Sequence, residues 1–254
     1  MSDLSAFSLA GKTVMVTGAN TGIGQGIALG LGRAGARVIG VGRSSMRETA
    51  ALMAEIGAPF EAVSADLGSS AAAQAMFEAA WAAHGPIDGL VNNAGIITRV
   101  DAVDFTEDDW DRVMDINLKT MFFLCQALGR KALAAGRPAR IVNIASMLSF
   151  QGGIRVASYT ASKSGVLGIT RLLANEWAGR GINVNAIAPG YIETNNTEAL
   201  RNDPDRSAAI LGRIPAGRWG LPADIGDAAV FLLAPASNYV HGAVIPVDGG
   251  WLAR

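Results

Sequence analysis

The sequence predicts an α/β fold in which helices cover both faces of a mainly parallel, doubly wound β-sheet. Three observations support this prediction. Apolar segments of strand length alternate with longer segments of helical periodicity along most of the 254 residues. Several of the short segments are apolar throughout rather than at every second position, as strands buried on both faces are. The first of them runs into a glycine-rich turn and then a helix, which is typical of a doubly wound sheet.

The predicted strands are short apolar runs bounded by turn residues. In chain order they are Lys12–Val16, Arg37–Val41, Phe60–Ser64, Gly89–Val91, Arg140–Ile144, Asn183–Ile187 and Ala243–Val247. Segments of helical spacing lie between them and predict the helices Ile23–Arg33, Ser70–Ala83, Asp108–Leu133, Ser158–Ala178 and Ala223–Leu233. Strand–helix–strand units of this kind form right-handed crossovers, so we expect parallel strands with helices on both faces.

The organisation of the chain predicts a single domain over residues 1–254. The sequence contains no linker, charge block or internal repeat. Residues 191–218 interrupt the alternation with a polar stretch that includes Asn195–Pro204. Because this stretch follows a strand end, we expect it to cover a substrate site at the carboxyl edge of the sheet.

The composition argues against several classes of protein. Lys and Arg (21) nearly balance Asp and Glu (22), so no overall basic field favours nucleic acid or anionic lipid. One cysteine and two histidines argue against a disulfide framework and a Cys/His metal site. The acidic N-terminus lacks a signal sequence, and the most apolar stretches are shorter than a membrane span. We therefore expect a cytoplasmic protein that binds no nucleic acid, membrane or metal.

A glycine-rich turn indicates a dinucleotide site. Gly18, Gly22 and Gly24 follow the pattern Gly-x3-Gly-x-Gly between the first predicted strand and the first helix. The first glycine permits a tight turn, and the other two allow backbone amides to approach a pyrophosphate. The unpaired N–H groups at the helix N-terminus add a partial positive charge that favours phosphate.

A second group of residues has the chemistry of ketone–alcohol interconversion. Tyr159 and Lys163 are four residues apart on a predicted helix, so their side chains lie on one face. A tyrosine can donate a proton to the oxygen of a ketone that receives hydride, or act as base in the reverse direction. We expect the lysine ammonium and an oxidised nicotinamide to lower the pKa of this tyrosine. Ser146, at the end of a predicted strand, is placed to polarise the carbonyl oxygen.

Taken together, the motifs resemble the short-chain dehydrogenase/reductase family over nearly the whole chain. They stand at Thr17-Gly18-x3-Gly22-x-Gly24, Asn92-Asn93-Ala94-Gly95, Asn117, Ser146, Tyr159-x3-Lys163 and Pro189-Gly190. The resemblance implies a metal-free, NAD(P)-dependent oxidoreductase on a Rossmann-type sheet of about seven strands, assembled as a homotetramer. It assigns catalytic roles to Asn117, Ser146, Tyr159 and Lys163. In the family, the residue matching Asn117 interrupts its helix and holds a water that relays protons to the lysine.

The resemblance also predicts the residues that contact the cofactor. They are Thr17, Gly18, Asn20, Gly22, Ile23, Gly24, Arg43, Asp66, Leu67, Asn93, Ala94, Gly95, Tyr159, Lys163, Pro189, Gly190, Ile192 and Thr194. The choice between NAD and NADP stays open at this point. Gly42 stands where NAD-dependent members place an acidic residue, and the guanidinium of Arg43 matches a 2′-phosphate unless it is a solvated loop residue.

The loop between Ser146 and Tyr159 is expected to border the substrate because it joins two catalytic positions. Four residues are predicted to contact substrate, namely Ser146, Gln151, Arg155 and Tyr159. Gln151 would bond hydroxyl groups, and Arg155, four residues before Tyr159, would bind a carboxylate. The alternative for Arg155 is a surface or interface ion pair.

Three segments narrow the resemblance to one branch of the family. Ser149–Arg155, Gly190–Asn196 and Val247–Arg254 resemble the 2-dehydro-3-deoxy-D-gluconate 5-dehydrogenases, also named 2-deoxy-D-gluconate 3-dehydrogenases. The resemblance implies a 3-deoxy keto-hexonate as substrate and NAD as the habitual cofactor. Two other functions stay open: a 3-oxoacyl-[acyl-carrier-protein] reductase, and a cofactor-binding regulator without turnover. The intact set of catalytic motifs argues against the regulator.

Overall fold

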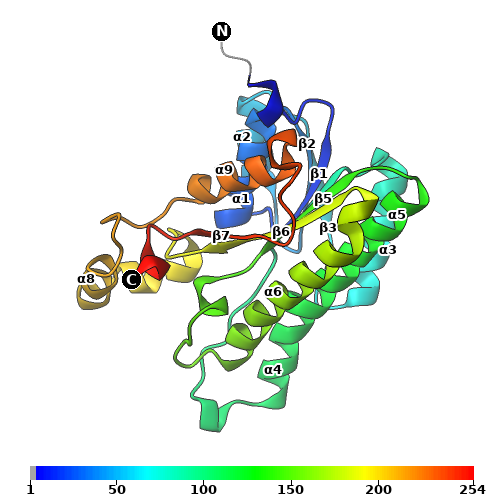
Figure 1. Cartoon of the computed structure of the whole chain (residues 1–254). Helices are drawn as coiled ribbons and strands as arrows, with labels where there is room; N and C mark the ends of the chain where they lie inside the picture. Colours follow the sequence, from blue (N-terminus) through cyan, green and yellow to red (C-terminus); the bar gives the residue numbers. More distant parts are fainter. Residues whose placement is uncertain (1–3) are drawn as a thin grey trace.

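The computed structural model describes residues 4–254, so the first three residues of the acidic N-terminus lie outside the described part. The centre of the molecule is a sheet of seven parallel strands in the order β3-β2-β1-β4-β5-β6-β7 (Figure 1). The strands are β1 (Thr13–Thr17), β2 (Arg37–Gly42), β3 (Phe60–Ser64), β4 (Gly89–Asn92), β5 (Ala139–Ile144), β6 (Ile182–Pro189) and β7 (Val244–Val247). The strand order reverses direction between β1 and β4, which confirms the predicted doubly wound fold.

Helices cover both faces of the sheet. One face carries α1 (Gly22–Arg33), α2 (Arg47–Glu55) and α9 (Pro222–Leu233), and the other carries α3 (Ser70–His84), α5 (Met121–Ala134) and α6 (Ala157–Trp177) (Figure 1). Neighbouring residues of β1 point to opposite faces: Met15 packs with Phe77 of α3, whereas Val14 packs with Ile27 of α1. All four side chains are almost fully buried, and burial of each contributes about 2 kcal/mol to folding.

Glycines allow α1 and α9 to pack closely. A Cβ atom on Gly26 would lie 2.5 Å from the carbonyl carbon of Pro222, and one on Gly226 would lie 2.6 Å from the carbonyl oxygen of Gly26. Real Cβ atoms do not approach other atoms so closely, so larger residues would separate the helices. This contact holds the glycine-rich turn, which leads into α1, in a fixed position beside the sheet.

The structure differs from the predicted elements in two places. Helix α2 was absent from the prediction because it is only nine residues long and buries one face through only two residues, Thr49 and Met53. The predicted helix Asp108–Leu133 is divided into α4 (Glu107–Met114), the π-helical segment Asp115–Thr120 and α5. Apolar periodicity cannot reveal a π-helical turn, because one extra residue in a turn leaves the overall pattern helical.

The polar stretch 191–218 contains short helices. They are a 3₁₀ turn at Asn195–Thr197, α7 (Glu198–Arg201) and α8 (Pro204–Leu211), followed by an irregular segment that leads to α9. We call residues 191–218 the covering segment. It projects beyond the sheet at the side where the C-terminus also lies (Figure 1). No helix within residues 4–254 has both the length and the apolarity that a membrane span requires.

Candidate active site

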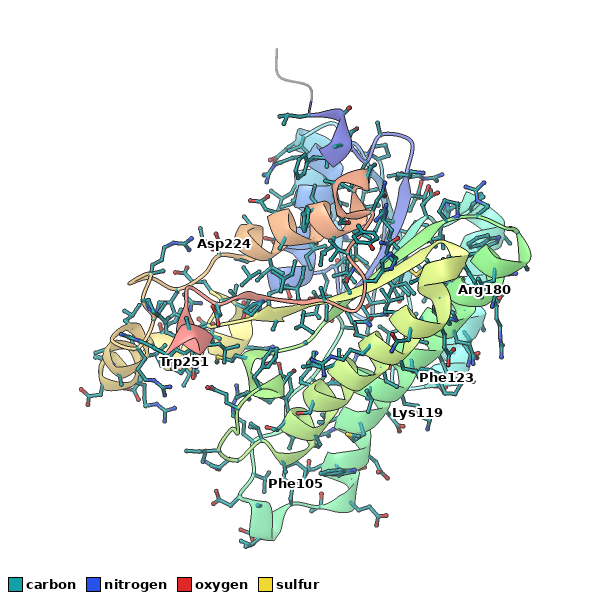
Figure 2. All side chains as sticks on the ribbon, viewed as in Figure 1. Phe105, Lys119, Phe123, Arg180, Asp224 and Trp251 are labelled. Atoms are coloured by element: carbon teal, nitrogen blue, oxygen red, sulfur yellow. The ribbon has the colours of Figure 1, made fainter. Side chains whose placement is uncertain are left out.

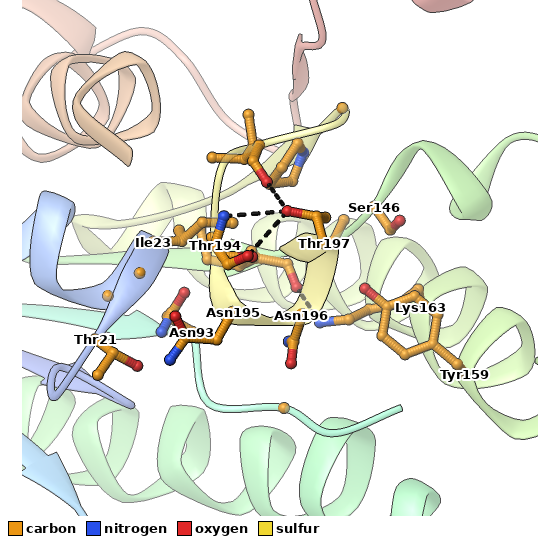
Figure 3. A pocket seen from close by; sticks show the side chains of 18 residues that line it. Thr21, Ile23, Asn93, Ser146, Tyr159, Lys163, Thr194, Asn195, Asn196 and Thr197 are labelled. Carbon is orange, nitrogen blue, oxygen red and sulfur yellow. Dashed lines mark hydrogen bonds between the residues drawn. The ribbon is translucent and has the colours of Figure 1, made fainter. Parts of the chain in front are cut away.

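A cavity of about 230 Å³ lies at the carboxyl edge of the sheet, beyond the ends of β5 and β6. It is lined by the glycine-rich turn, the start of α6, the end of β5 and the covering segment. The residues are Thr21, Gly22, Ile23, Gly24, Asn93, Gly95, Ile144, Ala145, Ser146, Tyr159, Lys163, Pro189, Gly190, Ile192, Thr194, Asn195, Asn196 and Thr197. Figure 3 shows Tyr159 and Lys163 on one side of it, Thr21 and Asn93 on the other, and Asn196 between them.

A second cavity of about 630 Å³ adjoins the first, and Gly95 lines both. Its lining consists of Gly18, Asn20, Gly42, Arg43, Ser44, Asp66, Leu67, Gly68, Ala94, Gly95, Ile96, Ile97, Thr98, Arg112 and Ile116. Every residue predicted to contact the cofactor, except Thr17, lines one or both of these cavities. The combined groove has the size and polarity expected of a dinucleotide site.

Thr17 lies outside both cavities and is 2% exposed. Its Oγ1 accepts hydrogen bonds from the backbone N–H groups of Asn93 and Ala94, each at 3.0 Å. The Asn93 side chain in turn donates to the carbonyl oxygens of Thr17 and Gly18. Thr17 therefore joins the ends of β1 and β4, and this contact gives the glycine-rich turn its shape.

The turn requires glycine at defined positions. Gly18 has φ +68° and Gly22 has φ +55°, a left-handed conformation that other residues rarely adopt. A Cβ on Gly24 would lie 2.0 Å from the carbonyl oxygen of Gly18, so a side chain there would destroy the turn. Backbone atoms therefore form this wall of the groove, which fits the close approach of a pyrophosphate to the N-terminus of α1.

Tyr159 lies in the first turns of α6 and faces the first cavity (Figure 3). Burial raises the pKa of the Tyr159 hydroxyl above its usual value, while a hydrogen bond with Ser146 and the charge of Arg99 act in the opposite direction. In the protein without cofactor, desolvation of the phenolate therefore outweighs the hydrogen bond with Ser146 and the charge of Arg99. That the lysine and an oxidised nicotinamide together lower this pKa stays a prediction.

Lys163 lies one helical turn after Tyr159 and is 4% exposed. Its Nζ donates a 2.6 Å hydrogen bond to the carbonyl oxygen of Ile144 and lies 5.7 Å from the centre of the Tyr159 ring. Burial lowers the pKa of the Lys163 ammonium to about 8. The lysine is thus held at the end of β5, where it can exchange a proton near neutral pH.

Asn117 lies at the centre of the π-helical segment and is buried. Its Oδ1 accepts from the backbone N–H of Ile96 and its Nδ2 donates to the carbonyl oxygen of Ile96, both at 2.9 Å. Nδ2 also donates to Ser162 Oγ at 3.3 Å. The predicted interruption of the helix at Asn117 is thus present. It joins the helix to the loop after β4 that borders both cavities.

The covering segment closes one side of the first cavity. Thr197 Oγ1 donates to the carbonyl oxygens of Ile192 and Thr194 and accepts from the backbone N–H of Thr194 (Figure 3). This arrangement holds Asn195 and Asn196 in the cavity wall. Neither asparagine was among the predicted site residues, although the polar run after a strand end was the signal that could have identified them.

Gln151 and Arg155 lie outside the lining of both cavities. Gln151 Oε1 accepts from the indole N–H of Trp251 at 3.2 Å. Arg155 has φ +66°, and its Nε lies 3.1 Å from Asp101 Oδ1 in an ion pair whose side chains are both more than half exposed. The structure thus places Arg155 in the surface ion pair that was its alternative. An exposed pair of this kind is worth less than about 1 kcal/mol, so a substrate carboxylate can compete with Asp101.

Arg99 is a cation near the reactive groups that sequence reasoning missed. It follows the Asn92–Gly95 motif by four residues, and its Nη2 lies 3.5 Å from the carbonyl oxygen of Asn196 in the covering segment. Its charge acts on the pKa of Tyr159. A cation directly after a cofactor motif is a weak signal in a sequence, because surface arginines are common in loops.

The comparisons with known proteins agree over the whole chain. A family model described as enoyl-(acyl carrier protein) reductase matches residues 18–252. The 2-dehydro-3-deoxy-D-gluconate 5-dehydrogenase of Escherichia coli is 57% identical over 99% of this chain and 99% of that protein. The chain belongs to the short-chain dehydrogenase/reductase family. This membership confirms the resemblance predicted from the motifs.

Solved structures of similar proteins support the assignment. A protein of Agrobacterium tumefaciens, solved with bound NADP, is 59% identical and matches 98% of this chain and 99% of its own with a TM-score of 0.94. A gluconate 5-dehydrogenase of Burkholderia cenocepacia, in complex with NADP and tartrate, is 36% identical and matches 99% of both chains with a TM-score of 0.92. This short-chain dehydrogenase/reductase thus shares its fold with nicotinamide-dependent enzymes.

Proposed function

We propose that this protein interconverts a ketone and a secondary alcohol on a 3-deoxy keto-hexonate, as a 2-dehydro-3-deoxy-D-gluconate 5-dehydrogenase does. The observation that carries the proposal is the convergence of Ser146, Tyr159 and Lys163 on a cavity whose opposite wall is the glycine-rich turn. The 57% identity to the Escherichia coli enzyme of that name supports the choice of substrate. Asn117 completes the proposed catalytic set.

The groove fits a nicotinamide dinucleotide. The residues lining the second cavity, from Gly18 to Leu67, would hold the adenosine end, and the residues lining the first would hold the nicotinamide end. When bound, the cofactor supplies or accepts the hydride. Arg43 and Ser44 lie at the end of β2, where a guanidinium and a hydroxyl are suited to a 2′-phosphate. We therefore favour NADP over NAD, in agreement with the NADP bound to both structures described above.

Tyr159 holds the proton that moves during the reaction. Its buried hydroxyl keeps this proton at neutral pH, and so it can donate the proton to a carbonyl oxygen placed beside it. The hydroxyl of Ser146 donates a hydrogen bond to the same oxygen and favours the charge that develops there. In the direction of alcohol oxidation, Tyr159 receives the proton instead.

Lys163 and Asn117 complete the path of the proton. The Lys163 ammonium is one turn from Tyr159, and its pKa of about 8 suits it to return a proton from solvent near neutral pH. Asn117 orients the loop that lies beside it, because both of its amide atoms bond to Ile96. A water between Asn117 and Lys163 would connect the lysine to solvent.

The acid end of the substrate requires a cation near the cavity. Arg99 and Arg155 are two candidates, on the loops after β4 and β5 respectively. Arg99 is close enough to influence the pKa of Tyr159, whereas Arg155 is paired with Asp101. We propose Arg99 as the principal carboxylate ligand, while Arg155 and Gln151 contact substrate after the loop closes on it.

Steady-state oxidation of NADPH and NADH with 2,5-diketo-3-deoxygluconate tests the proposal. Rapid oxidation of NADPH is the expected result, and a preference for NADH would reduce Arg43 to a loop residue. Turnover of an acetoacetyl carrier-protein thioester instead of the sugar acid would favour the acyl-carrier reductase. If cofactor binds but no ketone is reduced, the proposed activity is wrong and a regulator without turnover becomes the better interpretation.

We further propose that one domain spans residues 1–254 and that four copies form a homotetramer in the cytoplasm. Family membership supports the tetramer. Light scattering after size-exclusion chromatography should give about four times the 26.2 kDa mass of the chain. A monomer in this measurement would contradict the tetramer, and cell fractionation tests the compartment.

A further inference from the structure

Trp251 connects the C-terminal turn to two other segments beside the active site, the loop after Ser146 and the covering segment. It lies in the C-terminal 3₁₀ turn, is 4% exposed, and its Nε1 donates to Gln151 Oε1 at 3.2 Å. The ring of Tyr191, the first residue of the covering segment, meets the indole edge-on with ring centres 4.9 Å apart. The guanidinium of Arg213, in the covering segment, lies 4.0 Å from the indole centre. Figure 2 shows Trp251 at the C-terminal end of the chain, on the side of the covering segment.

The C-terminal turn that carries Trp251 is fixed in place. The carboxylate of Asp248 accepts hydrogen bonds from the backbone N–H groups of Gly250 and Leu252, both at 2.9 Å. Gly249 and Gly250 have φ of +65° and +87°, and a Cβ on Gly249 would lie 2.8 Å from Ile214 of the covering segment. The backbone of the C-terminal turn thus packs closely against the covering segment, and this contact leaves the indole little freedom to move.

The loop that Trp251 reaches is joined to the catalytic groups. Ser146 Oγ accepts from the backbone N–H of Leu148, and Ser149 Oγ donates to the carbonyl oxygen of Lys163 at 2.7 Å. Gln151 lies two residues after Ser149, and its backbone N–H donates to the carbonyl oxygen of Met147 at 3.3 Å. These bonds fix the backbone of Gln151 relative to Ser146 and Lys163.

The hydrogen bond from Trp251 also sets the direction of the Gln151 amide. An indole N–H can only donate, so it binds the oxygen of the amide and not its nitrogen. The NH₂ group of Gln151 then forms the end of the side chain that points away from Trp251. In this orientation the loop presents hydrogen-bond donors, which suit the hydroxyl, keto and carboxylate oxygens of a sugar acid.

We propose that Trp251 is a positioning residue for the substrate. It orients Gln151 and ties the loop after Ser146 to the covering segment, so that both sides of the substrate site move together. This inference deepens the proposed function and rests on it. It assigns to the C-terminal turn a role in substrate binding that is separate from cofactor binding, because Trp251 lines neither of the two cavities.

Trp251→Phe tests the proposal, with Trp219→Phe as the matched control. Trp219 is 7% exposed, packs in the same apolar cluster and also contacts Tyr191, but it does not bond to Gln151. We expect Trp251→Phe to raise KM for the sugar acid about five-fold, with kcat within about two-fold and Kd for NADPH unchanged. Trp219→Phe should leave the KM near that of the unmodified protein.

A double-mutant cycle shows whether the effect passes through Gln151. Gln151→Met should raise KM by a similar factor, and the combined variant should be no worse than either single variant. Additive effects, or equal effects of Trp251→Phe and Trp219→Phe, would overturn the proposal. If Trp251→Phe does not fold, Gln151→Met replaces it, because this variant leaves the C-terminal turn intact. Its KM for the sugar acid should then be raised relative to that of Trp219→Phe.

Hydrogen exchange measures the positioning without any substrate. The backbone amides of residues 148–151 should exchange faster in Trp251→Phe than in Trp219→Phe, because the loop loses its link to the tail. Equal exchange would overturn the positioning role whatever the substrate is. Faster exchange together with no turnover of the sugar acid by the unmodified protein would instead show that the proposed function is wrong and the positioning role is right.

Discussion

Opposing effects act on the proton of Tyr159. Burial favours the neutral hydroxyl, while the hydrogen bond with Ser146 and the charge of Arg99 favour the phenolate. In the protein alone the effect of burial prevails, so the hydroxyl keeps its proton, as its proposed role of proton donor requires. The spacing of Tyr159 and Lys163 was predictable because it is local to one helix. The balance of these effects was not, because it depends on Ser146 and Arg99 from other parts of the chain.

Tyr159→Phe should lower kcat by at least about 100-fold, because the substitution removes the proton donor and leaves the ring in place. The Kd for NADPH, measured by the quenching of protein fluorescence, should change little. Tyr239→Phe is the matched control, since it removes a hydroxyl from a fully exposed tyrosine. Turnover of Tyr159→Phe at the rate of Tyr239→Phe would contradict the assigned role.

Lys163 predicts a dependence of stability on pH. Its pKa of about 8 in the folded protein lies below the value of about 10.4 in an unfolded chain. Between about pH 8 and about pH 10.4 the unfolded chain binds more protons than the folded protein does. Burial of the ammonium therefore destabilises the fold fully below about pH 8, and this destabilisation disappears as the pH rises. Relative to Lys163→Met, the free energy of unfolding should increase by on the order of 3 kcal/mol from pH 7 to pH 10.5. Urea unfolding at both pH values measures the free energies. If the difference in free energy between the unmodified protein and Lys163→Met is the same at pH 7 and pH 10.5, the lowered pKa is contradicted.

Arg99 and Arg155 can be separated by paired substitutions. Arg99→Met should raise KM for the sugar acid about ten-fold or more, because a charged hydrogen bond to the carboxylate is lost. A neutral ketone should show little change, since it has no carboxylate to bind. Arg155→Met should have the smaller effect, because Arg155 lies outside the lining of both cavities, whereas the charge of Arg99 acts on the pKa of Tyr159. If only Arg155→Met raises the KM for the sugar acid, then Arg155 and not Arg99 is the principal ligand of the carboxylate.

At the scale of elements, the π-helical segment between α4 and α5 shows what local patterns can reveal. Apolar spacing predicted a helix through Asp108–Leu133, and the family resemblance predicted an interruption at Asn117; both are present. The partner of Asn117 could not be predicted from spacing. Ile96 is 21 residues away, and only the packing of the helix against the loop after β4 brings the two together.

Asn117→Leu should destabilise the protein by about 2 to 4 kcal/mol, because the N–H and the carbonyl oxygen of Ile96 both lose their partner. Urea unfolding in the absence of cofactor measures the effect. Asn175→Leu is a suitable control on an exposed face of α6. A loss of activity without a loss of stability would indicate that Asn117 acts through the proton path alone.

At the scale of the whole molecule, the fold places four strand ends at one edge and forms two adjoining cavities there. The ends of β1, β4, β5 and β6 bring the glycine-rich turn, the asparagine motif, Ser146 and the covering segment together. Arg43, at the end of β2, lies at the far end of this groove. Under the proposed function, the residue that selects the cofactor therefore lies at a distance from the proposed catalytic residues, and a substitution there should leave them unchanged.

Arg43→Leu should weaken the binding of NADPH about ten-fold and leave the binding of NADH unchanged, because only NADPH carries the 2′-phosphate. Ligand-induced shifts of the unfolding temperature measure both cofactors on one scale. Arg33→Leu, at an exposed position in the last turn of α1, controls for the loss of a surface charge. Equal losses for both cofactors would show that Arg43 does not bind the 2′-phosphate.

The sequence by itself determined the alternation of strands and helices, the glycine-rich turn and the facing pair Tyr159 and Lys163. All of these depend on neighbours within a few residues, through apolar spacing, backbone freedom and helical geometry. The structural role of Thr17, the position of Arg99 near Tyr159 and the bond between Trp251 and Gln151 became evident only from the tertiary structure. Each of these joins segments far apart in the chain, and packing rather than local preference brings such segments together.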